Sequence, residues 1–379
     1  MTDFEHILPL WHDLESAGAE YVLATVVAVE GSSYRKPGAR MLLAQDGRRA
    51  GTVSGGCLEA EVARRAWWLT ANGPAVERYS TLEDDGDLPY GSGCGGVVYI
   101  LLEPRATARP LLVAMERAFH ARESLAMATI MEGPRIGERE IAGYSSTPRA
   151  YSKEREPWKT DLRLLAEAAL ERCKTFESEL SIDGVRTRVW VDYRPARPGL
   201  WIFGAGDDAK PLLHLARELG WFVAVVDGRA HLATALRFPR ANEVCVLPIA
   251  ELPAAADYVD IHPTDAAVLM THSFEQDSRV LAALLARDRL PAYVGVLGPQ
   301  RRTRELLAEA ARLLGIERSA ERVENWLEQI HAPMGLDLNA DTPATIALSI
   351  LSEIQKSLSA STALPLREVR AVRASAAQV

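Results

Sequence analysis

Two cysteines of this chain lie in glycine-rich surroundings that suit metal or anion chemistry. Cys57 follows Ser54-Gly55-Gly56 and precedes a helical stretch, so backbone N–H groups and the positive helix end would stabilise its thiolate. Cys94 lies within Gly91-Ser-Gly-Cys-Gly-Gly96, where few side chains would surround the sulfur. A bulky ligand could therefore approach it closely, and the backbone N–H groups could hold an anion. Both cysteines are candidate cofactor contacts. For Cys57, a small buried residue that packs the helix start is the alternative.

The second candidate site is a glycine-rich turn, Gly204-Ala-Gly206-Asp-Asp-Ala209, between an apolar segment and a helical stretch. Gly204 permits a tight turn, and Gly206 lets a phosphate approach the backbone at the helix N-terminus. Asp227 ends the next predicted strand at the spacing that suits a ribose hydroxyl. Asp207 and Asp208 would meet an arriving pyrophosphate, which argues against tight dinucleotide binding. A turn kept only for packing is the alternative.

Three further groups could contact an anionic ligand. Arg35 and Arg40 flank Pro37-Gly38 between two predicted strands, where they could receive a phosphate. A solvated charged loop is the alternative. The residues Gly298-Pro-Gln-Arg-Arg-Thr-Arg304 follow a strand and place arginines in a helix's first turn, against its dipole. These arginines face either an anion or solvent.

His272 lies in Met270-Thr-His-Ser-Phe-Glu-Gln-Asp277, which follows a predicted strand and opens a helix. Ligands collect at the carboxyl ends of parallel strands. His272 could therefore contact a ligand or donate a proton, with Asp277 orienting its ring. The alternative is that Thr271 or Ser273 caps the helix and His272 is incidental.

The elements that must position these residues differ between the two halves of the chain. The N-terminal half mixes helical and alternating segments and predicts an α+β domain. The predicted elements are a helix ending near Gly18, a strand over 21–29, a hairpin around Asp46-Gly47, helices over 58–69, 109–122 and 160–174, a strand over 97–102, an irregular segment over 134–157 and a hairpin around Asp183-Gly184.

From residue 200 onward, strand and helix patterns alternate, which predicts an α/β fold with a Rossmann-like, doubly wound parallel sheet. The predicted strands are 200–204, 222–227, 243–247, 266–270 and 292–297, with a last helix over 345–356. We therefore expect an N-terminal α+β domain at 1–198, a Rossmann-like domain at 199–357 and a flexible tail at 358–379.

Composition narrows the class of protein. The chain has 379 residues, a formal net charge of −8 and 48% hydrophobic residues, which is typical of a globular protein and argues against a nucleic-acid binder. No apolar run is long enough to span a bilayer, and the N-terminus lacks a signal-peptide pattern. Four cysteines without C-x-x-C spacing favour a reducing cytoplasm. A homodimer is expected because two-fold assemblies are common.

Taken in order, the motifs resemble the xanthine dehydrogenase accessory protein family, also called XdhC/CoxI. In the N-terminal half the matching runs are Glu30-Gly-Ser-Ser-Tyr-Arg-Lys-Pro-Gly-Ala-Arg-Met41, Gly51-Thr-Val-Ser-Gly-Gly-Cys-Leu-Glu59 and Gly93-Cys-Gly-Gly96. In the C-terminal half they are Ile202-Phe-Gly-Ala-Gly206, Val226-Asp-Gly-Arg229, Met270-Thr-His272 with Asp277, Val294-Gly-Val-Leu-Gly298 and Ala332-Pro-Met-Gly-Leu-Asp337. Phe274 and Pro299 depart from the pattern, where relatives often carry histidine and serine.

The resemblance implies a maturation factor rather than an enzyme that turns over a metabolite. Such a factor binds the molybdenum cofactor (molybdopterin), supports its sulfuration by a cysteine desulfurase and passes it to an apo molybdenum hydroxylase of the xanthine dehydrogenase type. Cys57 and Cys94 are then the candidate molybdenum contacts, since a thiolate suits a soft metal. Two alternatives stay open: an NAD(P)-dependent oxidoreductase that uses the Rossmann domain, and a nucleotide-responsive regulatory protein.

Overall fold

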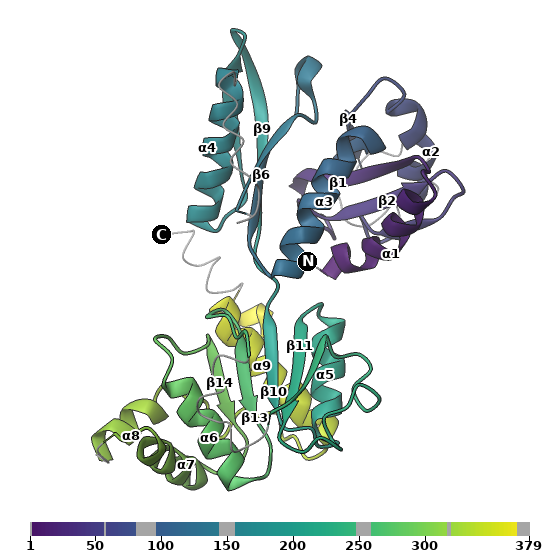
Figure 1. Cartoon of the computed structure of the whole chain (residues 1–379). Coiled ribbons are helices and arrows are strands. Elements are labelled where there is room, and N and C mark those ends of the chain that lie inside the picture. The colour runs from purple at the N-terminus through teal and green to yellow at the C-terminus, as the bar shows by residue number, and fades with distance from the viewer. Residues whose placement is uncertain are drawn as a thin grey trace. The chain divides into compact units, whose positions relative to one another are not determined.

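The chain folds into two compact units, Met1–Arg197 and Pro198–Val379, each with its own sheets and cores. The computed structural model describes residues 2–56, 58–80, 96–143, 156–247, 259–316 and 320–369 (Figure 1). Cys57 and Cys94 lie outside the described residues, as do 370–379 of the predicted tail. In the described part of the chain, no helix is both long and apolar enough to cross a membrane.

The first unit contains two antiparallel sheets. The five-stranded sheet has the order β3-β2-β1-β5-β4, and the four-stranded sheet has the order β7-β6-β9-β8. Their strands are β1 (Tyr21–Gly31), β2 (Arg40–Ala44), β3 (Arg49–Gly51), β4 (Ala75–Ser80), β5 (Gly96–Pro104), β6 (Leu125–Ile130), β7 (Arg139–Ala142), β8 (Phe176–Ile182) and β9 (Val185–Arg194). The helices are α1 (Thr2–Ser16), α2 (Glu59–Leu69), α3 (Arg105–Ala121) and α4 (Pro157–Arg172), with a 3-10 turn at Gly133–Arg135.

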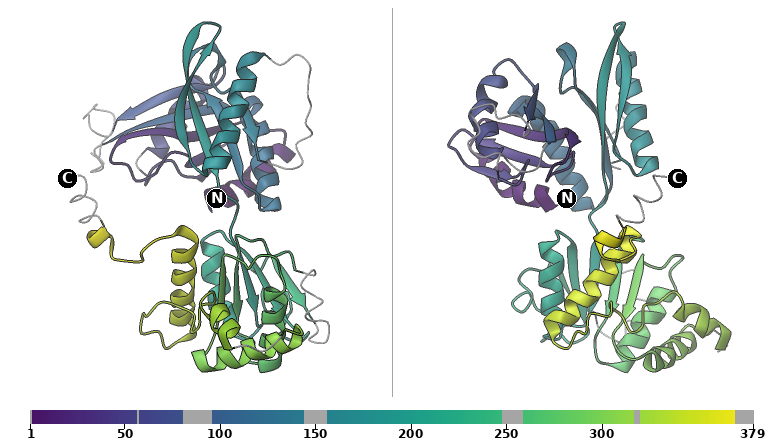
Figure 2. Two further views of the ribbon diagram at one scale, coloured as in Figure 1. Left: turned by 90° about the vertical axis from the view of Figure 1, so that its left-hand side faces the viewer. Right: turned by 180° about the vertical axis from the view of Figure 1, so that it is seen from behind.

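Each sheet of this unit is covered on both faces, as hydrophobic clusters show. Helix α2 packs on one face of the five-stranded sheet through Val62 and Ala66. Helices α1 and α3 cover its other face together with Leu125 and Met127 of β6. Helix α4 covers the outer face of the four-stranded sheet. Figure 2 shows these layers from two more sides. The inner face of the four-stranded sheet therefore meets the five-stranded sheet.

Most sequence predictions for this unit are confirmed. The opening helix, the strand at 21–29, both hairpins and the three later helices are present at nearly the predicted residues. Strands β4, β6 and β7 were not predicted. Strand β7 lies inside the segment expected to be irregular, so that expectation is wrong at Arg139–Ala142. Residues 144–155 of the same segment lie outside the described residues.

The second unit is a parallel five-stranded sheet with helices on both faces, which confirms the doubly wound prediction. Its strands are β10 (Gly199–Phe203), β11 (Phe222–Asp227), β12 (Glu243–Val246), β13 (Ala266–Leu269) and β14 (Tyr293–Val296), in the order β12-β11-β10-β13-β14. One face packs against α5 (Ala209–Glu218) and α9 (Pro343–Ser359), and the other against α6 (Phe274–Leu285), α7 (Gln300–Leu313) and α8 (Ala320–Leu327).

The order in which successive strands are added to this sheet reverses at β10. Strands β11 and β12 lie to one side of β10, and β13 and β14 lie to the other. In open α/β sheets, such a switch point forms a crevice at the carboxyl ends of the central strands. Gly204 follows β10, and His272 lies three residues after β13 ends. The topology therefore brings two of the predicted site segments to the same edge of the sheet.

Candidate functional site

The turn after β10 can be built only with glycine at its first position. Gly204 has a φ of +132°, and a Cβ atom there would lie 2.5 Å from the carbonyl oxygen of Met270. The Gly204 N–H donates to the carbonyl of Val226 at 2.8 Å, which ties the turn to β11. Gly204 is thus required because the backbones after β10 and β13 approach closely. This role is one of packing.

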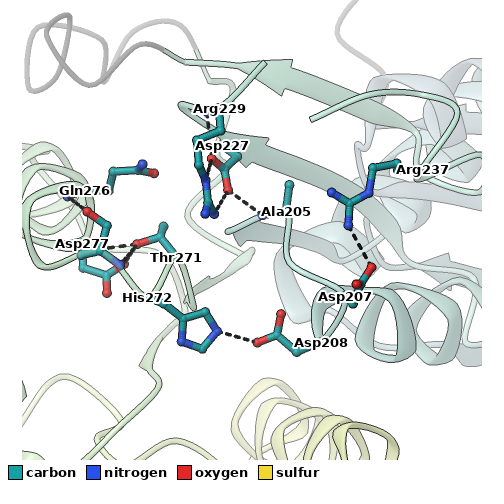
Figure 3. A network of polar contacts seen from close by, with 11 residues as sticks. Ala205, Asp207, Asp208, Asp227, Arg229, Arg237, Thr271, His272, Gln276 and Asp277 are labelled. Carbon is teal, nitrogen blue, oxygen red and sulfur yellow. Dashed lines mark hydrogen bonds and ion pairs between the residues drawn. The ribbon is translucent and has the colours of Figure 1, made fainter. Parts of the chain in front are cut away.

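Asp227 is the centre of a buried hydrogen-bond network at the end of β11 (Figure 3). One carboxylate oxygen accepts from the Ala205 N–H at 2.8 Å and from Arg229 Nη2 at 2.8 Å. The other accepts from the Arg229 N–H and Nε, each at 2.9 Å. Burial alone would raise the pKa of Asp227, but these bonds lower it on balance. Both oxygens are engaged, so a ribose hydroxyl would have to replace an existing bond.

Replacement of Arg229 by alanine is expected to destabilise the second unit by about 1–3 kcal/mol at pH 7, because it leaves a buried carboxylate with fewer donors. The lowered pKa of Asp227 means that this stabilisation is complete above the unfolded-state pKa, near 4. It is lost as the pH falls through the folded-state pKa. Urea unfolding of both proteins from pH 7 down to 3 should show the stability difference shrinking below about pH 4.

The control for this experiment is Arg240→Ala. Arg240 forms an ion pair with Glu218 at 2.6 Å on the surface, where both side chains are about half exposed or more. Exposed pairs contribute little to stability. A difference between wild type and Arg229→Ala that is constant across this pH range would contradict the proposed role of Asp227.

His272 and Asp208 form the second polar pair at this edge of the sheet. His272 adopts a left-handed φ of +59°, and its Nε2 lies 2.9 Å from Oδ2 of Asp208 (Figure 3). The imidazole is largely exposed, while Asp208 is mostly buried. The Asp208 carboxylate also folds over Gly206, where it would contact any Cβ atom. A left-handed histidine is uncommon and is often found at functional sites.

The start of α5 is therefore lined with carboxylates. Asp208 covers Gly206, and Asp207 forms ion pairs with Lys210 and Arg237, each at 2.8 Å. An anion at this helix N-terminus would have to displace Asp208. A neutral or cationic hydrogen-bond donor, by contrast, would meet acceptors already in place.

Asp277 does not orient His272, contrary to one of the two expectations. Its carboxylate is buried and accepts from Thr271 Oγ1 at 2.7 Å and from Arg302 Nη2 at 2.7 Å. Ser273 caps α6 by accepting from the Gln276 N–H, as the alternative expected. The first-turn arginine Arg302 thus bonds to Asp277 rather than facing solvent alone. Asp277 ties α7 to the loop that carries His272.

The N-terminal candidates lie in the first unit. Arg35 is half-buried in the loop after β1. Arg40 is buried, and its Nη2 lies 2.9 Å from Oδ2 of Asp192 on β9. Arg194 Nε contacts the same oxygen at 2.8 Å. Burial, and then the neighbouring Arg194, lower the pKa of Arg40 to about 10. The predicted anion ligand Arg40 is thus part of an ionic contact between the two sheets.

A second buried pair, which the sequence analysis missed, lies beside this contact. Glu103 of β5 forms an ion pair with Arg139 of β7, and burial raises the pKa of Glu103. The sequence carries no signal for either pair, since the partners are far apart along the chain. Together they form what we call the inter-sheet ion cluster: Arg40, Glu103, Arg139, Asp192 and Arg194.

The turn before Cys57 is held by a carboxylate. Glu59 at the start of α2 accepts from the Ser54 N–H at 2.9 Å, from Ser54 Oγ at 2.5 Å and from Thr52 Oγ1. Ser54 Oγ in turn accepts from the Gly56 N–H at 3.2 Å and the Leu58 N–H at 3.1 Å. The backbone on both sides of position 57 is therefore fixed by hydrogen bonds, a role for Glu59 that was not predicted.

The structure brings together only part of the predicted site. Gly204, Gly206, Asp227 and His272 lie at the carboxyl edge of the parallel sheet, and Asp277 lies in the first turn of α6. Arg35 and Arg40 lie in the other unit. Within the described ranges there is no group of three or more histidine, cysteine or acidic side chains that could hold a metal ion.

Comparison with known protein families gives matches in both units. Residues 14–80 match the family described as the XdhC and CoxI family, and residues 200–354 match the XdhC Rossmann domain. The chain belongs to the XdhC and CoxI family. The second match covers the parallel sheet except Gly199 of β10, and it covers every site segment described for the second unit. The expected family is thereby confirmed.

Several relatives of this XdhC and CoxI family member match over most of its length. It is 29% identical to a Bacillus subtilis protein described as a probable xanthine dehydrogenase subunit, over 88% of this chain and 92% of that protein. It is 26% identical to the molybdenum cofactor insertion chaperone PaoD of Escherichia coli, over 89% of this chain and 83% of PaoD. A crystal structure of a Bacillus halodurans protein described as a xanthine dehydrogenase matches with a TM-score of 0.69 and 27% identity, over 96% of this chain and 97% of that one.

Proposed function

We propose that this chain is a chaperone that binds the molybdenum cofactor, supports its sulfuration by a cysteine desulfurase and inserts it into a xanthine dehydrogenase-type molybdenum hydroxylase. The observation that carries the proposal is the match to PaoD, which runs through both units. PaoD is named for the insertion of this cofactor. The name of the Bacillus subtilis relative supports a xanthine dehydrogenase-type client.

The chemistry at the carboxyl edge of the parallel sheet is compatible with this role. Asp208 and His272 offer hydrogen-bonding groups at the switch point, while both oxygens of Asp227 are engaged within the chain. These contacts do not favour a nicotinamide nucleotide, whose ribose would compete with Arg229 for Asp227 and whose pyrophosphate would meet Asp208. Binding and transfer of a cofactor do not require catalytic acid and base residues at the carboxyl edge of the sheet.

The direct test is to isolate the full chain from cells that make molybdopterin and to quantify the bound pterin after oxidation. We expect pterin fluorescence in this preparation and none in protein from cells that cannot make molybdopterin. Fluorescence titration with NADH and NADPH serves as the second arm. Tight nucleotide binding without any co-purified pterin would overturn the proposal in favour of a nucleotide-responsive protein.

Cys94→Ala is expected to lower the amount of pterin that co-purifies, by about tenfold if the thiolate contacts the metal. Alanine removes the soft sulfur ligand. The measurement is the ratio of pterin to protein, with circular dichroism to verify the fold. Cys57→Ala tests the second cysteine in the same way.

The matched control is Cys173→Ala, because Cys173 is an exposed residue at the C-terminus of α4. Alanine keeps the left-handed backbone that Cys173 already adopts. The control should retain pterin as the wild type does. Normal retention by both Cys94→Ala and Cys57→Ala would assign these cysteines a structural role only.

A further inference from the structure

The first unit contains a cavity of about 390 Å³ between its two sheets. Its floor is apolar and comes from one hydrophobic cluster, with Val27, Met131 and Trp190 buried and Tyr99 half-buried. A volume above about 300 Å³ with mainly apolar and aromatic lining is typical of sites for small molecules. Of the candidate residues discussed above that the structure describes, none lines this cavity.

A bulge in β1 directs two consecutive side chains into the cavity. Strand β1 has a register irregularity between Val26 and Ala28 where it pairs with β5. Val27 and Ala28 are consecutive, yet both line the cavity. A β-bulge re-aims side chains in this way and is frequent beside binding sites. From the opposite wall, β9 contributes Arg188 and Trp190.

The rim of the cavity carries charges of both signs. Arg188 lies between two carboxylates, with Nη1 at 3.4 Å from Glu132 Oε1 and Nη2 at 3.3 Å from Glu177 Oε2. These distances are longer than those of a tight charge-assisted bond, and all three side chains are about half exposed. A ligand can replace such contacts at little cost. Arg78 adds a second positive charge to the rim.

We infer that this cavity binds the pterin ring of the cofactor, an inference that rests on the proposed function. A pterin is a planar ring system, which suits an apolar floor with Trp190 and Tyr99. Its amino-pyrimidine edge presents N–H groups much as a guanidinium does, so Glu132 or Glu177 can accept from it as they now accept from Arg188. Arg188, displaced from these carboxylates, can then pair with the phosphate of the cofactor.

The test uses 6-hydroxymethylpterin as the probe and its own fluorescence as the readout, with the full-length protein prepared from cells that lack molybdopterin. We expect saturable binding. Glu177→Gln is expected to weaken it by about tenfold, because a neutral amide replaces a charged acceptor. Ala28→Phe, which fills the cavity, should abolish it.

The matched control is Glu179→Gln, two residues along the same exposed face of β8. Glu179 pairs with Arg186 at 3.5 Å and does not line the cavity. This variant should bind the probe within about twofold of the wild type. Equal weakening by Glu177→Gln and Glu179→Gln, or unchanged binding by a folded Ala28→Phe protein, would overturn the inference. If the protein bound adenosine monophosphate as tightly as it binds 6-hydroxymethylpterin, the assignment of the cavity to a pterin would be overturned.

The same variants separate this inference from the proposed function. If wild-type protein isolated with molybdopterin carries the cofactor and Ala28→Phe carries as much, the cavity is not the site, and the proposed function still holds. If the wild type carries none while the probe binds with the expected dependence on Glu177, the cavity is a pterin site, but the proposed function and the assignment to this cofactor fail.

Discussion

Replacement of Asp192 by alanine is expected to destabilise the first unit by about 3–5 kcal/mol. Asp192 is 1% exposed and contacts the guanidinium groups of both Arg40 and Arg194. Without its carboxylate, Arg40 stays buried beside other arginines with no counter-charge on β9. Breaking a buried pair from one side leaves such an uncompensated charge, which is the costly case. Denaturation followed by hydrogen exchange at β2 and β9 amides measures the loss.

The control for this prediction is Asp13→Ala. Asp13 is 69% exposed on α1 and lies 3.3 Å from Arg48, so its loss should cost less than about 1 kcal/mol. A double variant in which Arg40 is replaced by methionine beside Asp192→Ala should recover part of the stability, because the buried charge is then removed. An Asp192→Ala protein as stable as Asp13→Ala would contradict the structural role of the inter-sheet ion cluster.

Gly204→Ala is expected to destabilise the second unit by roughly 2–6 kcal/mol, from backbone strain of about 1–3 kcal/mol and overpacking of a similar size. The added Cβ atom would lie 2.5 Å from the Met270 carbonyl oxygen, and this neighbour is backbone that cannot rotate away. Thermal or urea unfolding of the variant measures the effect.

Gly315→Ala separates the two causes. Gly315 also has a positive φ, +65°, but no atom lies within 4 Å of the position its Cβ atom would take. The substitution should therefore cost only the left-handed strain, about 1–2 kcal/mol. Similar losses for both variants would show that close approach of the two backbones at the switch point contributes nothing.

The second unit was the more predictable from its sequence. Its strands are continuous apolar runs, and helical segments separate them. This alternation of strands and helices indicates a parallel sheet even when the contacts between strands are unknown. The cap of α9 was also predictable, since Thr342 and Pro343 form standard helix-start chemistry and the structure shows Thr342 as the cap. Local patterns carry this information because each element is decided largely by its own residues.

The first unit was less predictable because its pairings are non-local. Strand β6 follows α3 directly, and β7 is only four residues long, so neither shows a clear alternation. Arg40 and Asp192 are 152 positions apart in the chain. A charged residue at the start of a strand suggests a solvent-facing or ligand-binding role until its distant partner is known.

The same limit applies to the candidate site of the second unit. The predicted parallel sheet is confirmed, and its topology places Gly204, Asp227 and His272 at one edge of the sheet. The sequence could not predict that the Arg229 side chain would donate to both carboxylate oxygens of Asp227. Nor could it predict that Asp208, rather than Asp277, would contact His272. These choices depend on side-chain directions in the loops, which no periodic pattern encodes.

Strand β9 has a consequence for which mutations this family member can accept. Its even-numbered side chains Arg188, Trp190, Asp192 and Arg194 include the cavity wall and part of the ion cluster, while Val189 and Val191 pack under α4. A single inserted residue ahead of Trp190 would exchange the two faces. Asp192 and Arg194 would then lie beneath α4, and Val191 would lie opposite Arg40. We therefore expect β9 to tolerate no change in length.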